Sequence, residues 1–194
     1  MLIHILRHGA TQGNTEGRYI GSTDEPLSEQ GAAVLQARKD EGLYPNCRQV
    51  YTSPMLRCAQ TADILYPEQP RVIVPDLAEY HFGIFEGKNY DELNGTLDYQ
   101  AFIDSDGKSP IPGAPDLGEY RAKCEVAFEG ICANADGDDI AIICHGGAIM
   151  AILQSVRPRA DIYDYRVKNG EGYTIEWARN HKEYGVVTPI GKDN

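Results

Sequence analysis

The sequence contains two apolar runs that end in a similar way: Leu2-Ile3-His4-Ile5-Leu6 leads into Arg7-His8-Gly9, and Ile140-Ala141-Ile142-Ile143-Cys144 leads into His145-Gly146-Gly147. Near-continuous apolar runs of this length are typical of central parallel strands that are covered on both faces. A shorter run, Val72-Ile73-Val74, has the same character, and we interpret it in the same way. Strands of this kind favour a fold built around a buried, mostly parallel sheet.

Helical patterns alternate with these runs along the chain. Ser28 is a suitable N-cap for one helix, Pro54 is suitable at the start of the next, and a third pattern has apolar residues three or four positions apart. Alternating strands and helices predict an α/β fold. The expected helices cover 28–43, 54–66, 117–131 and 149–156, and late strands are expected over 172–177 and 184–187.

A long segment before the third helix is irregular. Residues 76–116 contain several glycines and prolines, with short helical patterns around 89–94 and 97–104. A segment of this length in a compact domain is usually a functional covering loop, so we interpret it as a partial lid. The chain has 194 residues, 42% of them hydrophobic, and contains no tandem repeat or Ser/Gly linker. We therefore expect a single domain over 1–194, with a lid-like insertion at about 76–116.

The composition argues against several functional classes. The chain has 18 basic and 29 acidic residues, a net charge of −11, which disfavours nucleic acid or an anionic membrane as a partner. No apolar run approaches the roughly 18 residues of a membrane span, so we expect a soluble cytoplasmic protein. The five cysteines form no Cys-x-x-Cys pair, which argues against a disulfide framework and against a cysteine zinc site.

The histidines that follow the two apolar runs are the first candidate functional residues. In open α/β sheets ligands bind at the carboxyl ends of the strands, where His8 and His145 are expected. Each is followed by glycine, and the helix start expected after Gly147 favours an anion. Arg7 offers a planar fork for phosphate oxygens, one neutral imidazole is a suitable nucleophile, and the other can stabilise the charge of a transition state. This combination fits a phosphate monoester.

Five sequence blocks, in order, carry a family resemblance. They are Arg7-His8-Gly9-Ala10-Thr11-Gln12-Gly13-Asn14, the stretch 17–31, Tyr51-Thr52-Ser53-Pro54-Met55-Leu56-Arg57-Cys58-Ala59-Gln60-Thr61-Ala62, Leu77-Ala78-Glu79-Tyr80-His81-Phe82-Gly83-Ile84-Phe85-Glu86-Gly87, and His145-Gly146-Gly147. Together they resemble the motifs of the histidine phosphatase superfamily, also called the phosphoglycerate mutase-like family. The resemblance extends from residue 2 to about 156, and it implies a three-layer α/β/α fold with a mostly parallel central sheet.

The resemblance also implies a role for each matching residue. His8 would be the nucleophile that becomes phosphorylated, and Glu79 would protonate the leaving oxygen and then deprotonate water. Contacts to the phosphoryl oxygens are implied for Arg7, Arg57 and His145, and contacts to the ligand for Asn14, Ile20, Gly21 and Gly146. Neither a metal ion nor an organic cofactor is implied.

The charges around His8 lead to an expectation about pH. Arg7 and Arg57 beside this imidazole should keep it neutral, and hence nucleophilic, because they penalise the imidazolium form. An acid must begin protonated in order to donate its proton, as Glu79 would. We therefore expect an activity optimum near or below neutrality.

Within the family, the sequence favours a phosphatase over a mutase. The mutase branch uses a pair of arginines and a lysine in its insertion to hold a second anionic group, whereas residues 72–120 contain Lys88 and Lys108 but no arginine. Residues 76–119 hold ten Asp or Glu residues, which should disfavour a bisphosphorylated ligand. The block 17–31 looks most like alpha-ribazole phosphatases and broad-specificity sugar-phosphate phosphatases. We expect a phosphomonoesterase for a small phosphorylated metabolite, with alpha-ribazole phosphate or a sugar phosphate as candidates.

Other interpretations stay open. One is a phosphoglycerate mutase, a second is a non-catalytic phosphate-binding module, and a third is a metal hydrolase with His8, His145 and Glu79 around one ion. Two arginines beside a cation site would repel the ion, which disfavours the third. The oligomeric state is also open.

Some positions carry no functional assignment. Ala10 stands where the family frequently has an acidic residue, and Gly113-Ala114-Pro115-Asp116 stands where many relatives have Gly-Gly-Glu-Ser, so that capping of the next helix would pass to Asp116. His4 and His181 are expected in packing or surface positions. His81 is either exposed or close to the pocket.

Overall fold

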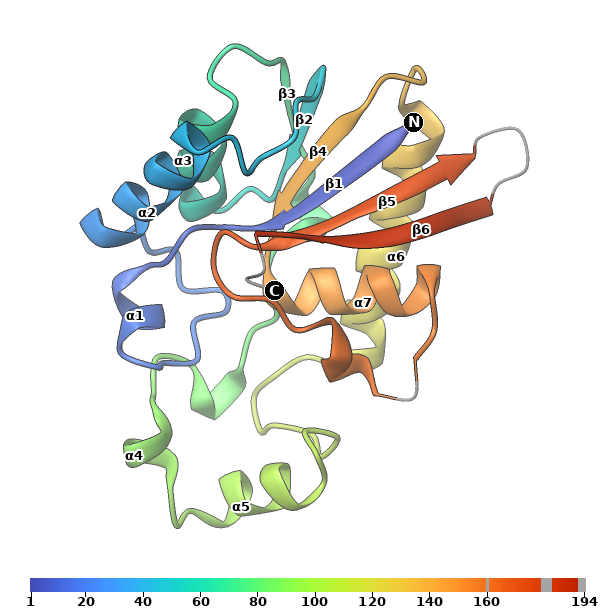
Figure 1. Cartoon of the computed structure of the whole chain (residues 1–194). Coiled ribbons are helices and arrows are strands. Elements are labelled where there is room, and N and C mark those ends of the chain that lie inside the picture. Colours follow the sequence, from blue (N-terminus) through green and yellow to red (C-terminus); the bar gives the residue numbers. More distant parts are fainter. Residues whose placement is uncertain (160, 179–182, 192–194) are drawn as a thin grey trace.

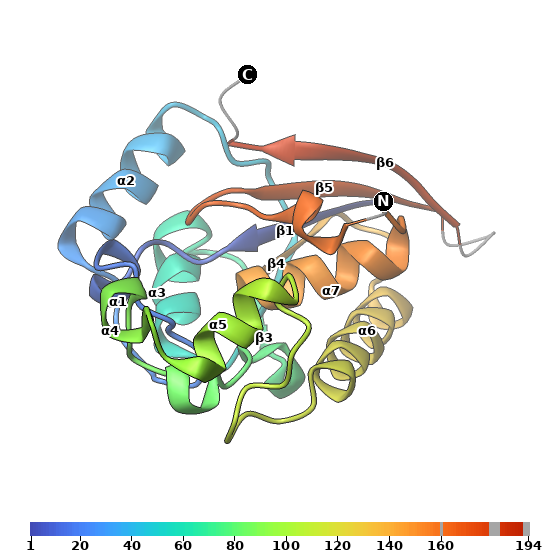
Figure 2. The ribbon, with the colours of Figure 1, turned by 90° about the horizontal axis from the view of Figure 1, so that it is seen from below.

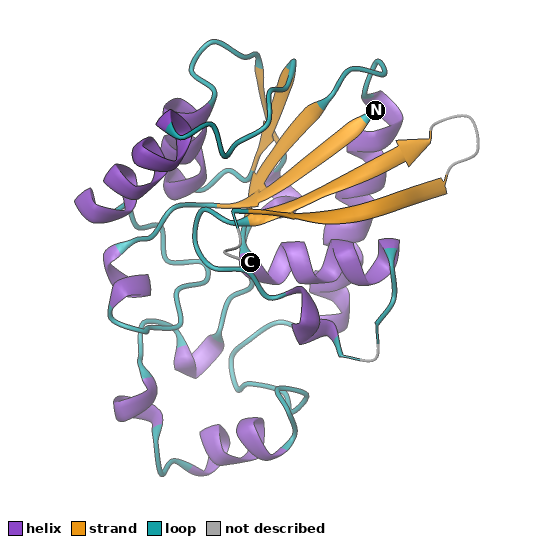
Figure 3. Ribbon diagram, viewed as in Figure 1, coloured by secondary structure: helices purple, strands orange, loops and turns teal. Residues whose placement is uncertain are grey.

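The computed structural model describes residues 1–159, 161–178 and 183–191, and its centre is one β-sheet (Figure 1). The strand order across this six-stranded sheet is β3-β2-β4-β1-β5-β6. Figure 3 shows the strands side by side, with helices and loops around them. The strands are β1 (Leu2–Arg7), β2 (Gln49–Thr52), β3 (Arg71–Ile73), β4 (Ile140–Cys144), β5 (Gly172–Ala178) and β6 (Glu183–Ile190).

The pairing pattern confirms the mostly parallel sheet. β4 lies between β1 and β2 and is parallel to both, and β3 is parallel to β2. β5 is antiparallel to β1, and β6 is antiparallel to β5. All five residues of β4 are buried, as expected for a central strand that is covered on both faces.

Helices cover the two faces of the sheet, which confirms the three-layer α/β/α arrangement (Figure 2). α2 (Glu29–Asp40) and α3 (Leu56–Leu65) pack on one face, where Leu35, Cys58 and Ala62 belong to one apolar cluster. α6 (Leu117–Asn134) and α7 (Gly146–Val156) pack on the other face, in the larger cluster. Among the described residues no helix is both long enough and apolar enough to cross a membrane.

Local signals set the helix starts. The Ser28 and Asp116 side chains accept hydrogen bonds from the amides of Gly31 and Glu119, which confirms both as N-caps. α3 begins two residues after Pro54, because Met55 remains extended. α7 begins at Gly146, earlier than the apolar pattern indicated, and α2 ends at Asp40 rather than near residue 43.

The interpretation of residues 72–74 as a strand covered on both faces is wrong. The strand at this place, β3, is the outermost one of the sheet and pairs with β2 along one side. Ile73 is 62% exposed and Val72 is 40% exposed. A run of three apolar residues has the same pattern in a central strand and in an edge strand, so the sequence could not distinguish the two.

Residues 76–116 form a separate layer at the carboxyl ends of β1 and β4 (Figure 1). They contain most of a short 3-10 helix (Pro75–Leu77), a second 3-10 helix (Gly83–Phe85), and the α-helices α4 (Tyr90–Leu93) and α5 (Leu97–Asp104). α4 and α5 confirm the short helical patterns expected around 89–94 and 97–104. This segment has its own apolar cluster around Tyr80, Phe85, Leu93, Tyr99 and Ile111. It is therefore packed as a unit over the sheet edge rather than as an extended loop.

Candidate active site

The pairing of β1 with β4 brings the two candidate histidines together. Arg7 is opposite Cys144 in the register of these parallel strands, so the next residues, His8 and His145, leave the sheet at the same edge. The amide of His8 donates to the carbonyl of Cys144 over 3.0 Å. The two imidazole centroids are 5.1 Å apart with an angle of 62° between the ring planes. Both side chains are buried, and the two rings are in edge contact.

One ring nitrogen of His8 has a fixed role. Nδ1 lies 2.6 Å from the carbonyl oxygen of Gly9, which can only accept a hydrogen bond, so Nδ1 carries the hydrogen. In a neutral imidazole this leaves a lone pair on Nε2. Burial, followed by the charges of Arg7 and Arg57, holds the pKa of His8 well below its usual value, so the neutral form of the ring is favoured. The geometry thus leaves Nε2 of His8 unprotonated and able to act as a nucleophile.

His145 is held by partners on two other elements. Its Nε2 lies 2.7 Å from the hydroxyl of Ser53 at the end of β2, and its Nδ1 accepts a hydrogen bond from Nε of Arg57 over 3.4 Å. Burial lowers the pKa of His145 well below the usual value, and the neighbouring His8, Arg57 and Arg7 lower it further. His145 is therefore also neutral, with its hydrogen on Nε2.

Arg57 is fully buried, and its guanidinium is fixed from two sides. α3 carries this side chain beneath residues 21–23, whose carbonyl groups at Gly21 and Thr23 accept from its two terminal nitrogens over 2.7 Å and 2.8 Å. These two bonds and the one to His145 use three of the five N–H groups of its guanidinium fork. A buried guanidinium without a carboxylate partner within the described residues is a strong anion-binding group.

Arg7 contributes the second guanidinium. Its terminal nitrogen donates to the carbonyl of Val167 over 2.9 Å, whereas its Nε is buried and has no hydrogen-bond partner in the described part of the chain. A Cβ added at Gly146, the first residue of α7, would lie 3.8 Å from this guanidinium, so the helix start and Arg7 are neighbours. A buried N–H without a partner is costly, and an anion at the start of α7 would satisfy it.

Glu79 lies on the other side of the start of α7. Its Oε1 accepts hydrogen bonds from the hydroxyl of Tyr120 over 2.7 Å and from the amide of Tyr80 over 2.9 Å. Its Oε2 accepts from the amide of Gly147 over 3.1 Å. Burial, followed by the charge of Glu79, holds the pKa of Tyr120 well above its usual value, so this hydroxyl stays protonated and donates. The structure thus brings Glu79 next to the residues that follow His145.

The four other expected ligand contacts differ in their surroundings. Asn14 Oδ1 accepts from Asn169 Nδ2 over 3.0 Å, and the same nitrogen is 3.2 Å from the carbonyl of His8, so Asn14 borders the site. Ile20 is buried against Gly13. The amide of Gly21 already donates to Glu86 over 2.9 Å. Gly146 faces the guanidinium of Arg7, as described above.

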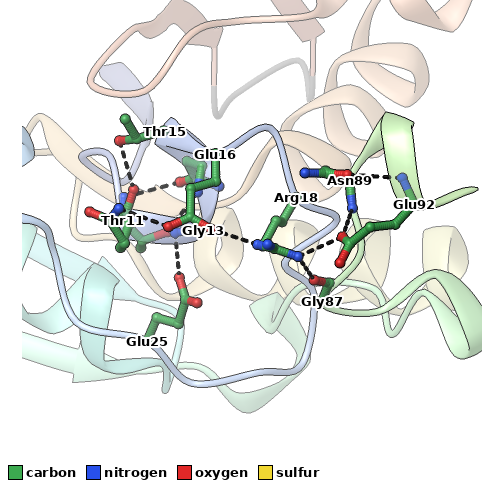
Figure 4. Close-up of polar contacts among 11 residues, drawn as sticks. Thr11, Gly13, Thr15, Glu16, Arg18, Glu25, Gly87, Asn89 and Glu92 are labelled. Atoms are coloured by element: carbon green, nitrogen blue, oxygen red, sulfur yellow. Dashed lines mark hydrogen bonds and ion pairs between the residues drawn. The ribbon is translucent and has the colours of Figure 1, made fainter.

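The loop 11–25, which carries Asn14, Ile20 and Gly21, is held in place by several polar contacts (Figure 4). Thr11 caps the short helix α1 (Gln12–Thr15), and Glu25 accepts from the amide of Gly13 over 3.1 Å. Arg18 then reaches the 76–116 segment, where it donates to the carbonyl of Gly87 and to Glu92, each over 2.7 Å. This loop therefore links the sheet edge to the layer above it.

Several residues of the site were missed by the sequence analysis: Ser53, Tyr120, Val167 and Asn169. Ser53 lies inside a recognised sequence block, so the family resemblance contained a signal for it. Tyr120 lies in the apolar pattern of the helix expected over 117–131, where a tyrosine is equally suited to a packing role. Asn169 is about 160 positions from the atoms that it contacts, and no sequence signal singles it out.

His4 and His81 lie outside this group, whereas one cysteine borders it, since Sγ of Cys58 is 3.5 Å from Nε2 of His145. His4 is buried and contacts the hydroxyl of Thr174 over 2.9 Å, which confirms a packing role. The ring of His81 is 2.7 Å from Ser22, and its side chain is 43% exposed. His181 lies outside the described residues. The five cysteines are buried free thiols. Within the described ranges no three His, Cys, Asp or Glu side chains form a group suited to a metal ion, so His8, His145 and Glu79 are not such a group.

The chain matches the histidine phosphatase superfamily (branch 1) over residues 3–187. It is 28% identical to phosphoglycerate mutase-like protein 4 of Arabidopsis thaliana over 191 residues, which cover 90% of this chain and 83% of that protein. It is 24% identical to the adenosylcobalamin/alpha-ribazole phosphatase of Salmonella typhimurium, covering 88% of this chain and 87% of the relative. The crystal structure of the alpha-ribazole phosphatase from Shigella flexneri has the same fold, with a TM-score of 0.81, 24% identity and coverage of 100% of both chains. The chain therefore belongs to the histidine phosphatase superfamily.

Proposed function

We propose that this protein is a phosphomonoesterase that hydrolyses a small phosphorylated metabolite through a phosphohistidine intermediate on His8. The observation that carries this proposal is the state of the His8 ring. Its Nδ1 is bound to the carbonyl of Gly9, and its pKa is held well below the usual value by burial and by two arginines. A neutral imidazole with an unprotonated Nε2, next to buried guanidinium groups, suits attack on a phosphoryl group.

In the first step, the lone pair on Nε2 of His8 forms a bond to phosphorus, and the bond between phosphorus and the ester oxygen breaks. Arg7 and Arg57 bind the phosphoryl oxygens, whose negative charge they stabilise, and His145 does so once its hydrogen is on Nδ1, with the Ser53 hydroxyl donating to Nε2. Glu79 donates its proton to the leaving oxygen, so the product is a neutral alcohol. The hydrogen bonds from Tyr120 and Gly147 hold the carboxyl group in place for this transfer.

In the second step, water attacks the phosphorus atom and the bond to Nε2 breaks. Glu79, now a carboxylate, accepts the proton of the water, and the electron pair returns to Nε2 of His8. Phosphate leaves and the starting protonation state is restored. The residues supply all proton transfers, so the proposal includes no metal ion or organic cofactor. Asn14, Ile20, Gly21 and Gly146 are proposed ligand contacts around this centre.

Alpha-ribazole phosphate and sugar phosphates are the proposed substrate candidates. The name of the Salmonella relative includes alpha-ribazole phosphatase, which supports the first candidate. The absence of arginine in residues 72–120 disfavours a second anionic group on the substrate, and so supports a monophosphate. A cytoplasmic location, as expected from the sequence, is part of the same proposal.

The proposal is tested by trapping the intermediate. The wild-type protein is mixed with a ³²P-labelled monoester, quenched in base, and examined for a label that is stable to base and lost in acid. We expect this label in the wild-type protein and in His81→Ala, a control histidine outside the site, and no label in His8→Ala. A label of equal intensity in His8→Ala would place the nucleophile elsewhere. Activity that disappears in EDTA and returns with a divalent cation would instead favour the metal hydrolase.

Phosphoglycerate mutase activity is the second candidate, because one relative bears the name phosphoglycerate mutase-like protein 4. A mutase transfers the phosphoryl group between two carbon atoms and needs 2,3-bisphosphoglycerate, whereas a phosphatase releases phosphate to water. We expect phosphate release that is independent of the bisphosphate. A protein that binds monoesters but releases no phosphate and forms no intermediate would be the non-catalytic module.

A further inference from the structure

Asn169 lies in a tight turn directly before β5. The amide of Glu171 donates to the carbonyl of Lys168 over 3.1 Å, and Gly170, between them, has a φ of +74°. This combination is typical of a type II turn, in which the positive φ belongs to the third residue, here Gly170. The turn itself therefore does not require asparagine at position 169, and the side chain of this residue is open to another role.

The turn is fixed against the end of β1 by main-chain contacts. The amide of Arg7 donates to the carbonyl of Glu171 over 2.8 Å, and the amide of Gly170 is 3.1 Å from the carbonyl of Arg7. The hydroxyl of Tyr44 donates to the carbonyl of Gly170 over 2.9 Å. Asn169 is thus held beside the nucleophile by bonds that do not involve its own side chain.

The contacts of the Asn169 amide group identify its nitrogen. One atom of this group lies 3.2 Å from the carbonyl oxygen of His8, 3.4 Å from that of Gly9 and 3.0 Å from Oδ1 of Asn14. A carbonyl oxygen can only accept a hydrogen bond, so this atom is Nδ2, which donates. One of its two hydrogens serves the carbonyl groups of the nucleophile turn, and the other is directed to Asn14.

The orientation of the Asn14 amide group follows from the same reasoning. Its Oδ1 is 3.2 Å from the main-chain nitrogen of Thr11, which can only donate, so the atom that faces Thr11 is the oxygen. This bond is part of the capping box of α1, and Asn169 adds a second, shorter bond at 3.0 Å. With both donors on Oδ1, the NH2 group is the arm that remains for a ligand. In the described part of the chain this NH2 group has no protein partner.

The two arms of the Asn14 amide group differ in their effect on a phosphoryl group. An N–H group attracts an anion, whereas a carbonyl oxygen repels it. Arg7, a proposed contact of the phosphoryl oxygens, lines the same groove as Asn14 and Asn169. An amide group that is turned over at Asn14 would present its oxygen to the anion. The second hydrogen bond to Oδ1 makes this turned form less favourable.

We propose that Asn169 is a positioning residue, which holds the NH2 group of Asn14 towards the phosphoryl group of the substrate. The carbonyl groups of His8 and Gly9 anchor the Asn169 side chain, and this side chain acts on the substrate through Asn14. The inference rests on the proposed function, in which Asn14 contacts the ligand.

A double-mutant cycle with Asn14→Ala and Asn169→Ala measures this connection. We expect Asn14→Ala to lower kcat/KM about 10–100-fold, the effect of losing a hydrogen bond to a charged group. Asn169→Ala should lower kcat/KM about tenfold, because the Asn14 amide group is then held by one donor fewer. In the double variant we expect kcat/KM within about threefold of Asn14→Ala, since Asn169 has nothing left to position. Independent effects would multiply, and a double variant about tenfold below Asn14→Ala would overturn the proposal.

Tyr44→Phe separates positioning of Asn14 from support of the turn. This variant removes the hydrogen bond to the carbonyl of Gly170 and leaves the side chain of Asn169 in place. We expect a lower urea midpoint, with kcat/KM within about threefold of the wild type. Equal losses of kcat/KM in Tyr44→Phe and Asn169→Ala would mean that Asn169 supports the turn alone, and would overturn the proposal.

Asn169→Ser covers the case in which the alanine variant does not fold. Serine is common in turns, and its donor is one bond closer to the main chain than Nδ2 of asparagine, so it falls short of Oδ1 of Asn14. We expect the same loss of kcat/KM and the same non-additivity with Asn14→Ala. Wild-type kcat/KM in a folded Asn169→Ser would overturn the proposal.

Binding of inorganic phosphate distinguishes failure of this inference from failure of the proposed function. Calorimetric titration of the wild type, the two alanine variants and the double variant requires no turnover. We expect Kd to rise about tenfold in each single variant, and to differ by no more than about threefold between the double variant and Asn14→Ala. If the wild type releases no phosphate from monoesters, the proposed function fails and this phosphate cycle decides the inference alone. Multiplying effects on Kd, or wild-type affinity in Asn169→Ala, would overturn the inference, and a wild type that binds no phosphate would overturn both.

Discussion

Tyr120 donates a hydrogen bond from its hydroxyl group to Oε1 of Glu79 over 2.7 Å, while the amide of Gly147 donates to Oε2 of the same carboxylate over 3.1 Å. The two donors belong to α6 and α7, which pack side by side on one face of the sheet. The orientation of the carboxylate therefore depends on the relative position of two helices as well as on the loop that carries it, where the amide of Tyr80 donates to Oε1 over 2.9 Å. This arrangement connects the packing of the α-layer to the proposed proton transfer.

Replacement of Tyr120 by phenylalanine removes this donor but keeps the ring, which packs against Tyr80 at a centroid distance of 5.3 Å. We expect kcat to fall about tenfold with little change in KM, because a hydrogen bond to a charged group is worth roughly 1.5–3 kcal/mol and this one orients the acid. Steady-state rates over a range of substrate concentrations measure kcat and KM separately.

The matched control for this variant is Tyr66→Phe. The Tyr66 hydroxyl donates to the carbonyl of Pro45 over 3.0 Å, in the apolar cluster on the other side of the sheet. This variant should lose a buried hydrogen bond but retain the wild-type kcat and KM. Equal effects of both substitutions on kcat would mean that Tyr120 acts through stability alone.

Gly147 offers a second test of the position of Glu79. A Cβ at this residue would lie 2.4 Å from Oε1 of Glu79 and 3.1 Å from the Tyr120 hydroxyl, so Gly147→Ala must displace the carboxylate. We expect a loss of about 100-fold in kcat, the effect of a shift of about 1 Å in a reacting group. Gly130→Ala, in α6, is the control, because its Cβ would meet no atom within 4 Å. It should keep full activity and raise the free energy of unfolding by about 0.5–1 kcal/mol.

The sequence predicted the sheet and the core of the site for physical reasons that are local. The runs 2–6 and 140–144 are long and apolar enough to be recognised as central strands, and each ends at a histidine, so their parallel pairing brings His8 and His145 together. Arg57 and Glu79 were found from family motifs, because a single arginine on a helix and a single glutamate in a loop carry no pattern of their own. Their roles in catalysis stay predictions.

Other features depend on contacts that are distant in sequence. Tyr120 fits an apolar helix stripe equally well as a packing residue, and its role appears only where α6 meets Glu79. The expected influence of arginines on His8 was correct in direction, but burial is the largest cause of the lowered pKa. β3 was assigned to the wrong environment because three apolar residues contain no information about how many neighbours a strand has.

Arg57→Lys tests whether the geometry of the guanidinium matters beyond its charge. Lysine keeps the positive charge but cannot contact Gly21, Thr23 and His145 from one planar group. We expect kcat/KM to fall about 100-fold, since two N–H groups of a fixed fork are lost to the phosphoryl oxygens. Urea denaturation should show that the free energy of unfolding falls by about 1.5–3 kcal/mol, the contribution of a hydrogen bond to a charged group.

The control for this variant is Arg71→Lys. Arg71 forms an ion pair with Asp63 over 2.6 Å at the surface, where such pairs contribute about 0–1 kcal/mol. Its substitution should change neither kcat/KM nor the urea midpoint by a measurable amount. Retention of wild-type kcat/KM in Arg57→Lys would mean that charge alone is sufficient at this position.

The buried neutral histidines predict how stability depends on pH. The pKa of His8 and of His145 is well below the usual value in the folded protein, whereas unfolded histidine has a pKa of about 6.5. Above about pH 6.5 both rings are neutral in both states, so their contribution to stability is complete. As the pH falls below this value, the unfolded chain binds protons that the folded protein excludes. The free energy of unfolding should therefore decrease by up to about 1.4 kcal/mol per pH unit for each ring.

His145→Gln tests this dependence, because glutamine is uncharged at every pH used. Urea unfolding at pH 7.0, 6.0, 5.5 and 5.0 should show a smaller decrease in stability for the variant, by up to about 1.4 kcal/mol per pH unit below pH 6. The comparison uses slopes, so a constant loss of stability in the variant does not affect it. Tyr66→Phe, which removes a buried hydrogen bond but no imidazole, is the control and should keep the wild-type slope. Parallel curves for the wild type and His145→Gln would contradict a neutral, buried His145, and with it the electrostatic account of the two-histidine site.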